Sequence, residues 1–176
     1  PRHFRGGPNI KHLSIPALLV LLALPALPAS AQLAVPNADG ITYGHVHLNV
    51  ADIEVHKKLW VDHFEGIVVQ KGPLTTVKFP GFVLVLTLGK PTGNSQGTAM
   101  DHFGFKVRNM DTFLAKWEAD GLDVSTEAAG FGGRTFLGAE GQINAFVDLP
   151  GGARVELQED QGLQEEVTGY HIHFNT

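Results

Sequence analysis

The stretch Gly44-His45-Val46-His47-Leu48-Asn49-Val50 decides the fold, because a counterpart of it occurs later in the chain. The counterpart is Asp101-His102-Phe103-Gly104-Phe105-Lys106-Val107, and both stretches share the pattern His-x-x-apolar-x-Val. Their apolar residues recur at every second position, which predicts half-buried strands. Each stretch leads into a segment with helical apolar spacing that carries a tryptophan. We therefore expect an internal duplication.

The segments around these two strands read twice as strand, helix and three strands. The expected elements, in order, are 41–50, 51–64, 67–71, 75–79, 82–88, 101–107, 110–120, 122–126, 143–149 and 154–158. One βαβββ unit cannot bury its sheet face alone, whereas a second copy can cover it. The sequence predicts an α+β domain at 32–160, with module one at about 41–90 and module two at about 99–160.

Length and composition exclude several classes of protein. The chain has 176 residues, 13 Lys+Arg against 18 Asp+Glu, a net charge of −5, nine histidines and no cysteine. It is too short for a (β/α)8 barrel, and it lacks the basic block that a nucleic-acid partner requires. Without cysteine there are no disulfides and no thiolate metal sites, so any metal must be held by histidine and carboxylate.

The first 31 residues read as a secretory signal peptide. Arg2, Arg5 and Lys11 precede an apolar run from Leu13 to Pro28, and Ala29-Ser30-Ala31 follows as an A-x-A site. Three prolines interrupt the run and no basic stop-transfer flank follows it, which disfavours a membrane anchor. We expect cleavage after Ala31 and no stable membrane anchor in the mature protein. A bacterial protein that is secreted or periplasmic is predicted.

Three motifs of the chain resemble the vicinal-oxygen-chelate (VOC) superfamily, which includes glyoxalases, extradiol dioxygenases and fosfomycin- and bleomycin-resistance proteins. The opening His-x-x-Leu-x-Val of that family is similar to 45–50, and its fifth-strand equivalent is similar to 102–107. The closing Asp-Pro-x-Gly-x-x-hydrophobic-Glu-Leu pattern resembles 149–157. The resemblance implies paired βαβββ modules that form a U-shaped mixed sheet around a metal or ligand cavity.

The resemblance also implies a ligand set. Carried over position by position, the metal ligands are His45, His102 and Glu156. Metal-binding glyoxalases place a further Glu on the fourth strand, and the matching slot here is Val85. Two histidines and one carboxylate form the facial triad of non-haem Fe(II) oxygenases, and they also hold Mn(II) or Zn(II). A divalent ion, Fe(II), Mn(II) or Zn(II), is the expected cofactor.

Strand periodicity supplies further candidates near these ligands. Residues 45, 47 and 49 point to one face of a strand, as do 102, 104 and 106. His47 is therefore the acid/base candidate, because a neutral imidazole beside a metal-bound oxygen can move a proton. Asn49 and Lys106 are predicted substrate contacts, and Gly104 is expected to leave room for the metal or the substrate.

Other polar residues are assigned to a solvated surface or to the rim of the site. His56 and His63 lie on the first predicted helix beside lysines and an aspartate, so we expect both on a solvated face. The segment 130–133 is read as a rim loop, near which Arg134, Phe136 and Glu140 could touch substrate.

The end of the chain repeats its beginning. Residues 168–176 keep the His-x-His-apolar-Asn pattern of 45–49, after a polar linker that starts at 161. We interpret 161–176 as a linker and the first strand of a second, truncated VOC pair. The alternatives are an edge strand that pairs with the first sheet, or a dimer contact.

The function predicted from these features is that of an exported, metal-dependent enzyme acting on a small molecule with two adjacent oxygens. Dioxygen-dependent ring cleavage and metal-assisted isomerase or lyase chemistry both fit, and the missing fourth-strand Glu favours the first. The alternative is a non-catalytic protein that encloses a small ligand, as resistance members of the family do. The expected partners are the small-molecule substrate and either a second copy of the chain or a second VOC pair.

Overall fold

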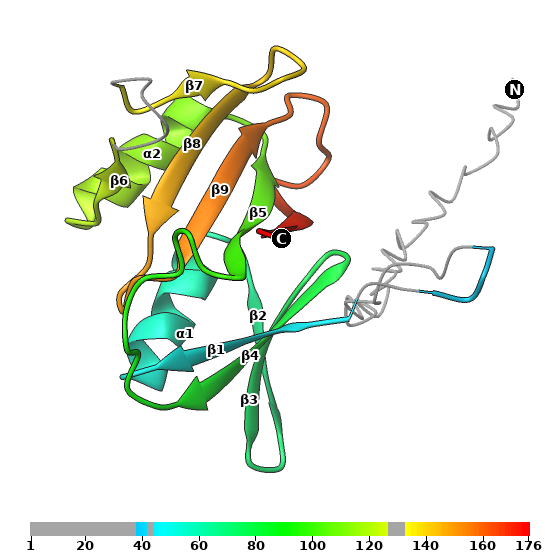
Figure 1. The fold of residues 1–176 in the computed structure, drawn as a ribbon, viewed down its shortest axis with the longest axis vertical. Coiled ribbons are helices and arrows are strands. Elements are labelled where there is room, and N and C mark those ends of the chain that lie inside the picture. The colour runs from blue at the N-terminus through cyan, green and yellow to red at the C-terminus, as the bar shows by residue number, and fades with distance from the viewer. Residues whose placement is uncertain (1–37, 42–43, 127–132) are drawn as a thin grey trace, which may run out of the picture. The chain divides into compact units, whose positions relative to one another are not determined.

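The computed structural model describes residues 38–41, 44–126 and 133–176 (Figure 1). The predicted signal peptide at 1–31 and most of the predicted rim loop at 130–133 lie outside these ranges. No helix within the described ranges is long and apolar enough to cross a membrane.

The first half of the domain contains one helix and a four-stranded sheet. Its elements are β1 (Val46–Val50), α1 (Ile53–Asp62), β2 (Ile67–Lys71), β3 (Leu74–Phe79) and β4 (Phe82–Leu88). The strand order is β1-β4-β3-β2, and β1 runs parallel to β4. Asp52 caps α1, since its carboxylate accepts hydrogen bonds from the backbone N–H groups of Glu54 and Val55.

The second half contains the other helix and a six-stranded sheet. Its elements are β5 (Met100–Val107), α2 (Met110–Ala119), β6 (Val124–Ser125), β7 (Phe136–Leu137), β8 (Ile143–Asp148), β9 (Arg154–Glu159) and β10 (Val167–Phe174). The order is β10-β5-β9-β8-β6, with β7 paired to β8. Strand β5 runs parallel to β9, as β1 does to β4, so the two halves share one strand order.

Alternation along β5 separates an apolar face from a polar one. Phe103, Phe105 and Val107 are almost fully buried in the core, to which Met110 and Trp117 of α2 contribute. The helix lies against this face of the sheet (Figure 1). His102, Gly104 and Lys106 alternate with the core residues and therefore lie on the opposite face.

A continuous aromatic core joins the two halves. Trp60 of α1 and Trp117 of α2 are both completely buried. The ring of Phe64, just after α1, lies 4.9 Å from that of Phe105 on β5, measured between centroids. The predicted α+β fold with paired βαβββ modules is confirmed, and the observed elements agree with the predicted ones to within a few residues over most of the domain. The duplication itself stays a prediction.

The C-terminal strand β10 is an edge strand of the second sheet. It pairs antiparallel with β5, placing His173 opposite His102 and His171 opposite Gly104, with irregularities after Gly169 and His173. Among the described residues, no strand pairs with the outer edge of β1. The edge that β10 covers on β5 therefore corresponds to the edge that is free on β1.

Candidate metal centre

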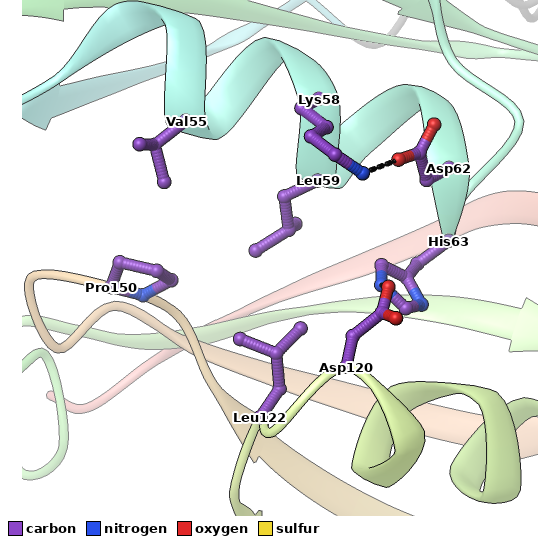
Figure 2. Close-up of a pocket in the computed structure, with 8 residues that line it drawn as sticks. All are labelled: Val55, Lys58, Leu59, Asp62, His63, Asp120, Leu122 and Pro150. Carbon is purple, nitrogen blue, oxygen red and sulfur yellow. Dashed lines mark hydrogen bonds and ion pairs between the residues drawn. The ribbon is translucent and has the colours of Figure 1, made fainter.

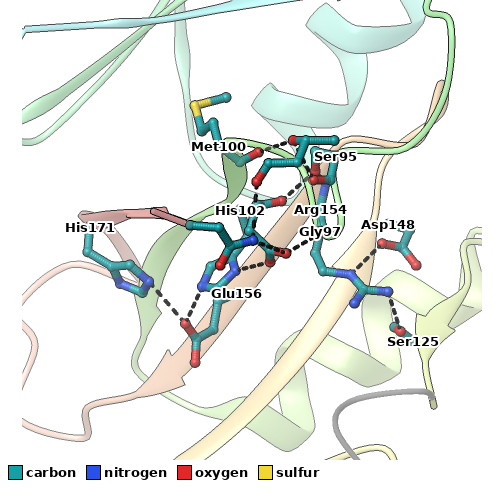
Figure 3. Close-up of polar contacts among 12 residues, drawn as sticks. Ser95, Gly97, Met100, His102, Ser125, Asp148, Arg154, Glu156 and His171 are labelled. Carbon is teal, nitrogen blue, oxygen red and sulfur yellow. Dashed lines mark hydrogen bonds and ion pairs between the residues drawn. The ribbon is translucent and has the colours of Figure 1, made fainter.

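Three side chains on the polar face of the second sheet form a potential metal-binding group. They are His102 on β5, Glu156 on β9 and His171 on β10, and one ligand atom of each lies within 4.8 Å of the others. The Nε2 atoms of both histidines lie 3.0 Å from the same Oε2 of Glu156 (Figure 3). The group is largely enclosed, since the side chains of His102, Glu156 and His171 are 8%, 13% and 26% exposed.

The registers of three neighbouring strands explain why these side chains meet. Gly104 on β5 lies opposite Glu156 on β9 and opposite His171 on β10. A Cβ atom at Gly104 would lie 2.5 Å from Cε1 of His171, far inside normal contact distance. Glycine at this position is thus what lets the imidazole of His171 lie over β5 and reach Glu156.

Two further polar groups hold the ligands in place. Asp101 lies 2.6 Å from Nδ1 of His102, so that nitrogen carries the proton and donates it to the carboxylate. Asn144 on β8 donates from Nδ2 to Oε1 of Glu156 at 2.7 Å. Metal-binding histidines usually donate a hydrogen bond from their other ring nitrogen to a carboxylate, and metal-binding carboxylates usually accept a hydrogen bond from a neighbouring side chain. The residues present therefore fit a divalent metal ion.

The charges of the group are strongly coupled. Burial opposes ionisation of Glu156, but hydrogen bonds from His102 and His171 outweigh it and lower the pKa of Glu156 to about 2. Burial likewise opposes protonation of His102, but its hydrogen bonds to Glu156 and Asp101 raise its pKa above the usual value. The carboxylate is therefore ionised at neutral pH and attracts positive charge, whether this is carried by protons or by a metal ion.

The surroundings of the group combine aromatic and charged side chains. The ring of His173 stacks on that of His102, with centroids 4.7 Å apart. The ring of Phe146 packs edge to face with that of His102, with centroids 5.1 Å apart, and the ring of Phe136 stacks on that of Phe146, with centroids 5.3 Å apart. An apolar aromatic wall thus stands beside the polar ligands.

Comparison with known proteins finds likeness in structure alone. No protein-family model matches the chain, and no curated protein sequence matches it. The fosfomycin resistance protein FosX from Listeria monocytogenes superposes with a TM-score of 0.54 at 14% identity, covering 70% of this chain and 95% of that chain. FosX from Mesorhizobium loti superposes with a TM-score of 0.53 at 13% identity, covering 67% of this chain and 91% of that chain. A mutant Listeria FosX complexed with Mn(II) and a dihydroxypropylphosphonic acid superposes with a TM-score of 0.53 at 15% identity. This match covers 70% of this chain and 92% of that chain.

These structures belong to the superfamily that the sequence motifs resemble. The chain has the vicinal-oxygen-chelate fold. Within this fold, Val85 faces His47 across the parallel pair β1–β4 as Glu156 faces Gly104 across β5–β9. The VOC motif thus supplies a carboxylate in the second half and an aliphatic side chain in the first, as the sequence indicated.

The structure brings together only part of the predicted ligand set. His102 and Glu156 meet, but their third partner is His171 and not His45. His45 precedes β1 in the other sheet, and its Nε2 lies 2.8 Å from Nε2 of His47. The reason is topological, since β10 and not β1 pairs with β5. The repeat of His-x-His-apolar-Asn in the tail is the sequence signal that points to His171.

The predicted acid/base residue and substrate contacts lie in different parts of the domain. His47 and Asn49 are exposed on one face of β1, as the alternation predicted. Lys106 donates to Asp160 at 2.8 Å and lies over the ring of Tyr170, so its charge is already partnered. The room beside Gly104 is taken by His171.

The rim residues Arg134, Phe136 and Glu140 likewise differ in their surroundings. Arg134 pairs with Glu118 of α2. Phe136 belongs to the aromatic wall beside His102. Glu140 is exposed, and its backbone N–H donates to Gln142.

The prediction that His56 and His63 lie on a solvated face is wrong. They are 2% and 6% exposed, because α1 turns this side toward the second half of the domain. His56 bonds to the carbonyl of Pro150 at 2.9 Å, and Nε2 of His63 lies 3.1 Å from Asp120. Figure 2 shows His63 beside Asp120 at the edge of a pocket of about 360 Å³. Burial lowers the pKa of both histidines, so they act as neutral packing groups.

Proposed function

We propose that this chain is a metal-dependent enzyme of the VOC type that acts on a small molecule carrying two adjacent oxygens. The observation that carries the proposal is the enclosed group of His102, Glu156 and His171, with Asp101 behind one ligand and Asn144 behind another. The complex of the related-fold Listeria FosX with Mn(II) supports a divalent metal as the cofactor. Fe(II), Mn(II) and Zn(II) all suit two imidazoles and one carboxylate.

Each residue has a distinct task in this proposal. His102, Glu156 and His171 would hold the ion, which supplies Lewis-acid stabilisation of negative charge on vicinal oxygens. Asp101 fixes the tautomer of His102 so that Nε2 faces Glu156. The aromatic wall of Phe146 and Phe136 offers an apolar surface for the body of the substrate.

The acid/base role that the sequence predicted for His47 passes, in this proposal, to His173. The two residues hold the same place in the repeated His-x-His motif. His173 stacks on His102 and is exposed, so it can exchange a proton with a bound substrate and with water. His47 is not part of the group around Glu156.

The deciding experiment measures metal content and turnover on the same samples. The protein is loaded with Fe(II), Mn(II) or Zn(II), and bound metal is counted for the wild type, His102→Ala, His171→Ala and His45→Ala. We expect the first two variants to lose the metal and His45→Ala to lose none of the metal at this centre, because His45 is outside the group. His173→Gln should keep the metal but lose most of the turnover.

The reaction is then sorted by assay. Oxygen uptake with catechols is measured against isomerase and lyase assays with glyoxalase substrates. We expect dioxygen-dependent cleavage, because two imidazoles and one carboxylate form the facial triad of non-haem Fe(II) oxygenases. Less than about a tenth of a metal ion per loaded chain, with His171→Ala changing nothing, would replace the enzyme by a non-catalytic binder of small ligands.

We also propose that the protein is exported and that residues 1–31 are removed in the process. The basic head, the apolar run and the A-x-A site support this proposal. Expression of the chain, preceded by an initiator methionine, in a bacterial host, followed by N-terminal sequencing of the periplasmic fraction, tests it. A new N-terminus at Gln32 is expected, and an unprocessed cytoplasmic product would contradict it.

A further inference from the structure

The histidine pair at the start of β1, His45 just before the strand and His47 on it, forms a second potential metal site, away from the proposed centre. His45 and His47 are two residues apart, so their side chains leave the same face of the strand. Both are exposed, and their Nε2 atoms lie 2.8 Å apart, with the ring centroids at 4.7 Å. Without a metal, one ring donates a hydrogen bond to the other.

The surroundings leave this pair accessible and without a carboxylate. Among the described residues, the outer edge of β1 has no strand partner. The neighbouring position on β4 is Val85, the aliphatic counterpart of Glu156. No described carboxylate completes a three-ligand group with the pair. The site would therefore consist of two neutral imidazoles, with water in the remaining positions.

The donor set indicates which ion fits. The 2.8 Å between the two Nε2 atoms is a hydrogen-bond distance, and it shows that both rings turn Nε2 toward the same point. Nitrogen ligands with water in the other positions are typical of tetragonal Cu(II) and Ni(II), and among divalent ions copper binds such ligands most tightly.

We propose that His45 and His47 form a bidentate site for Cu(II), independent of the centre at Glu156. The ion takes the place of the hydrogen bond between the two Nε2 atoms. The Nε2 proton of the donor ring is exchanged through water onto its own Nδ1, so that both rings stay neutral and both Nε2 atoms bind the ion. The proposal does not rest on the proposed enzymatic function, since none of its residues belongs to the centre on the second sheet.

Copper titration of the full-length chain tests the proposal, read by calorimetry and by electron paramagnetic resonance. The matched control is the double substitution His47→Asn with Asn49→His, which keeps the composition and the strand. It moves the second imidazole to about 13 Å from the first along the strand, too far to share an ion. We expect this variant and His45→Ala each to bind one Cu(II) fewer than the wild type and to lose the signal of two coordinated imidazoles.

Two results would overturn the site. One is a double variant that binds as many Cu(II) ions as the wild type, with an unchanged resonance spectrum. The other is loss of the same copper ion on Glu156→Gln, because that ion would then belong to the centre on the second sheet. Conversely, if Glu156→Gln abolishes binding at the centre on the second sheet and leaves the copper ion at His45 and His47 unchanged, the two sites are separate.

Discussion

Strands β1 and β10 carry the same motif and use it differently. In both, two histidines with one residue between them are followed by an apolar residue and an asparagine. On β10, His171 reaches Glu156 and His173 stacks on His102. On β1, His45 and His47 contact each other in an exposed position.

The difference lies in what the neighbouring strands offer. Strand β10 lies beside β5, where Gly104 leaves space for an imidazole, and Glu156 follows on the next strand. Strand β1 lies beside β4, whose matching residue is Val85. A His-x-His motif therefore marks a donor strand, whereas the adjacent glycine and glutamate decide whether a complete site forms.

The largest effect is expected from Gly104→Val. The new side chain would occupy the place of the His171 ring and push β10 away from Glu156. We expect metal affinity at the centre to fall by roughly a hundredfold or more, since a ligand is lost. Isothermal titration measures this, and hydrogen exchange of β10 amides should accelerate in parallel. Gly44→Val is the control, because a Cβ there meets nothing within 4 Å. Equal affinities in both variants would refute the role given to Gly104.

Asp101→Asn should lower the metal affinity of the centre less than Gly104→Val does. The amide is a poorer acceptor for Nδ1–H of His102 and no longer fixes one ring tautomer. A loss of about 10–100-fold in metal affinity is expected, which competition with a chromophoric chelator measures. Asp111→Asn, in the first turn of α2, controls for the change in net charge. A wild-type affinity in Asp101→Asn would show that the carboxylate has no such role.

Val85→Glu adds to the β1–β4 pair a feature of the second sheet, whereas the two preceding variants remove features from the second sheet. It gives the β1–β4 pair the carboxylate that the β5–β9 pair has, opposite His47. We expect metal binding at His45 and His47 to tighten by roughly tenfold and the fold to lose about 1–3 kcal/mol, because Val85 is buried. Val85→Gln is the matched control, with a similar shape and no charge. If both variants bind equally, the carboxylate is not the missing component.

The smallest effect concerns His63, the buried histidine that directly follows α1 and serves packing. Burial lowers the pKa of His63, against the opposing effect of Asp120, while Lys116 adds to the lowering and Asp62 opposes it. A histidine with a lowered folded-state pKa stabilises the fold above its unfolded-state pKa of about 6.5, and this contribution is lost as the pH falls below that value.

Thermal unfolding at about pH 7.5 and about pH 5.5 measures this loss, and His63→Gln should reduce the difference by up to about 1 kcal/mol. His47→Asn, on the exposed face of β1, serves as the control and should leave the difference unchanged. A pH dependence that is identical in His63→Gln and wild type would contradict the assignment.

Local patterns predicted most of the fold and two of the three side chains that meet in the candidate centre. Apolar periodicity placed α2 at Met110, where it begins, and the motif placed His102 and Glu156. The sequence pointed to His45 where the structure brings His171 beside Glu156, because the two histidines have the same local sequence and only strand pairing distinguishes them. Pairing between strands distant in sequence is not encoded in a short motif.

The burial of His56 and His63 was missed for a different reason. The lysines and the aspartate beside them suggested a solvated helix face. However, His56, Trp60 and His63 are spaced as one helical stripe, and Trp60 is completely buried. The spacing was the better signal, because the second half of the domain covers that stripe.

The place of His171 near the end of β10 has a consequence for the order of events during synthesis. A ribosome completes His102 and Glu156 well before it reaches His171, so a growing chain has only two of the three donors. The 54-residue separation of the first two donors must also close before they meet. The three-donor coordination is therefore not available before β10 is made, and the choice of metal falls to the compartment that holds the protein when β10 docks.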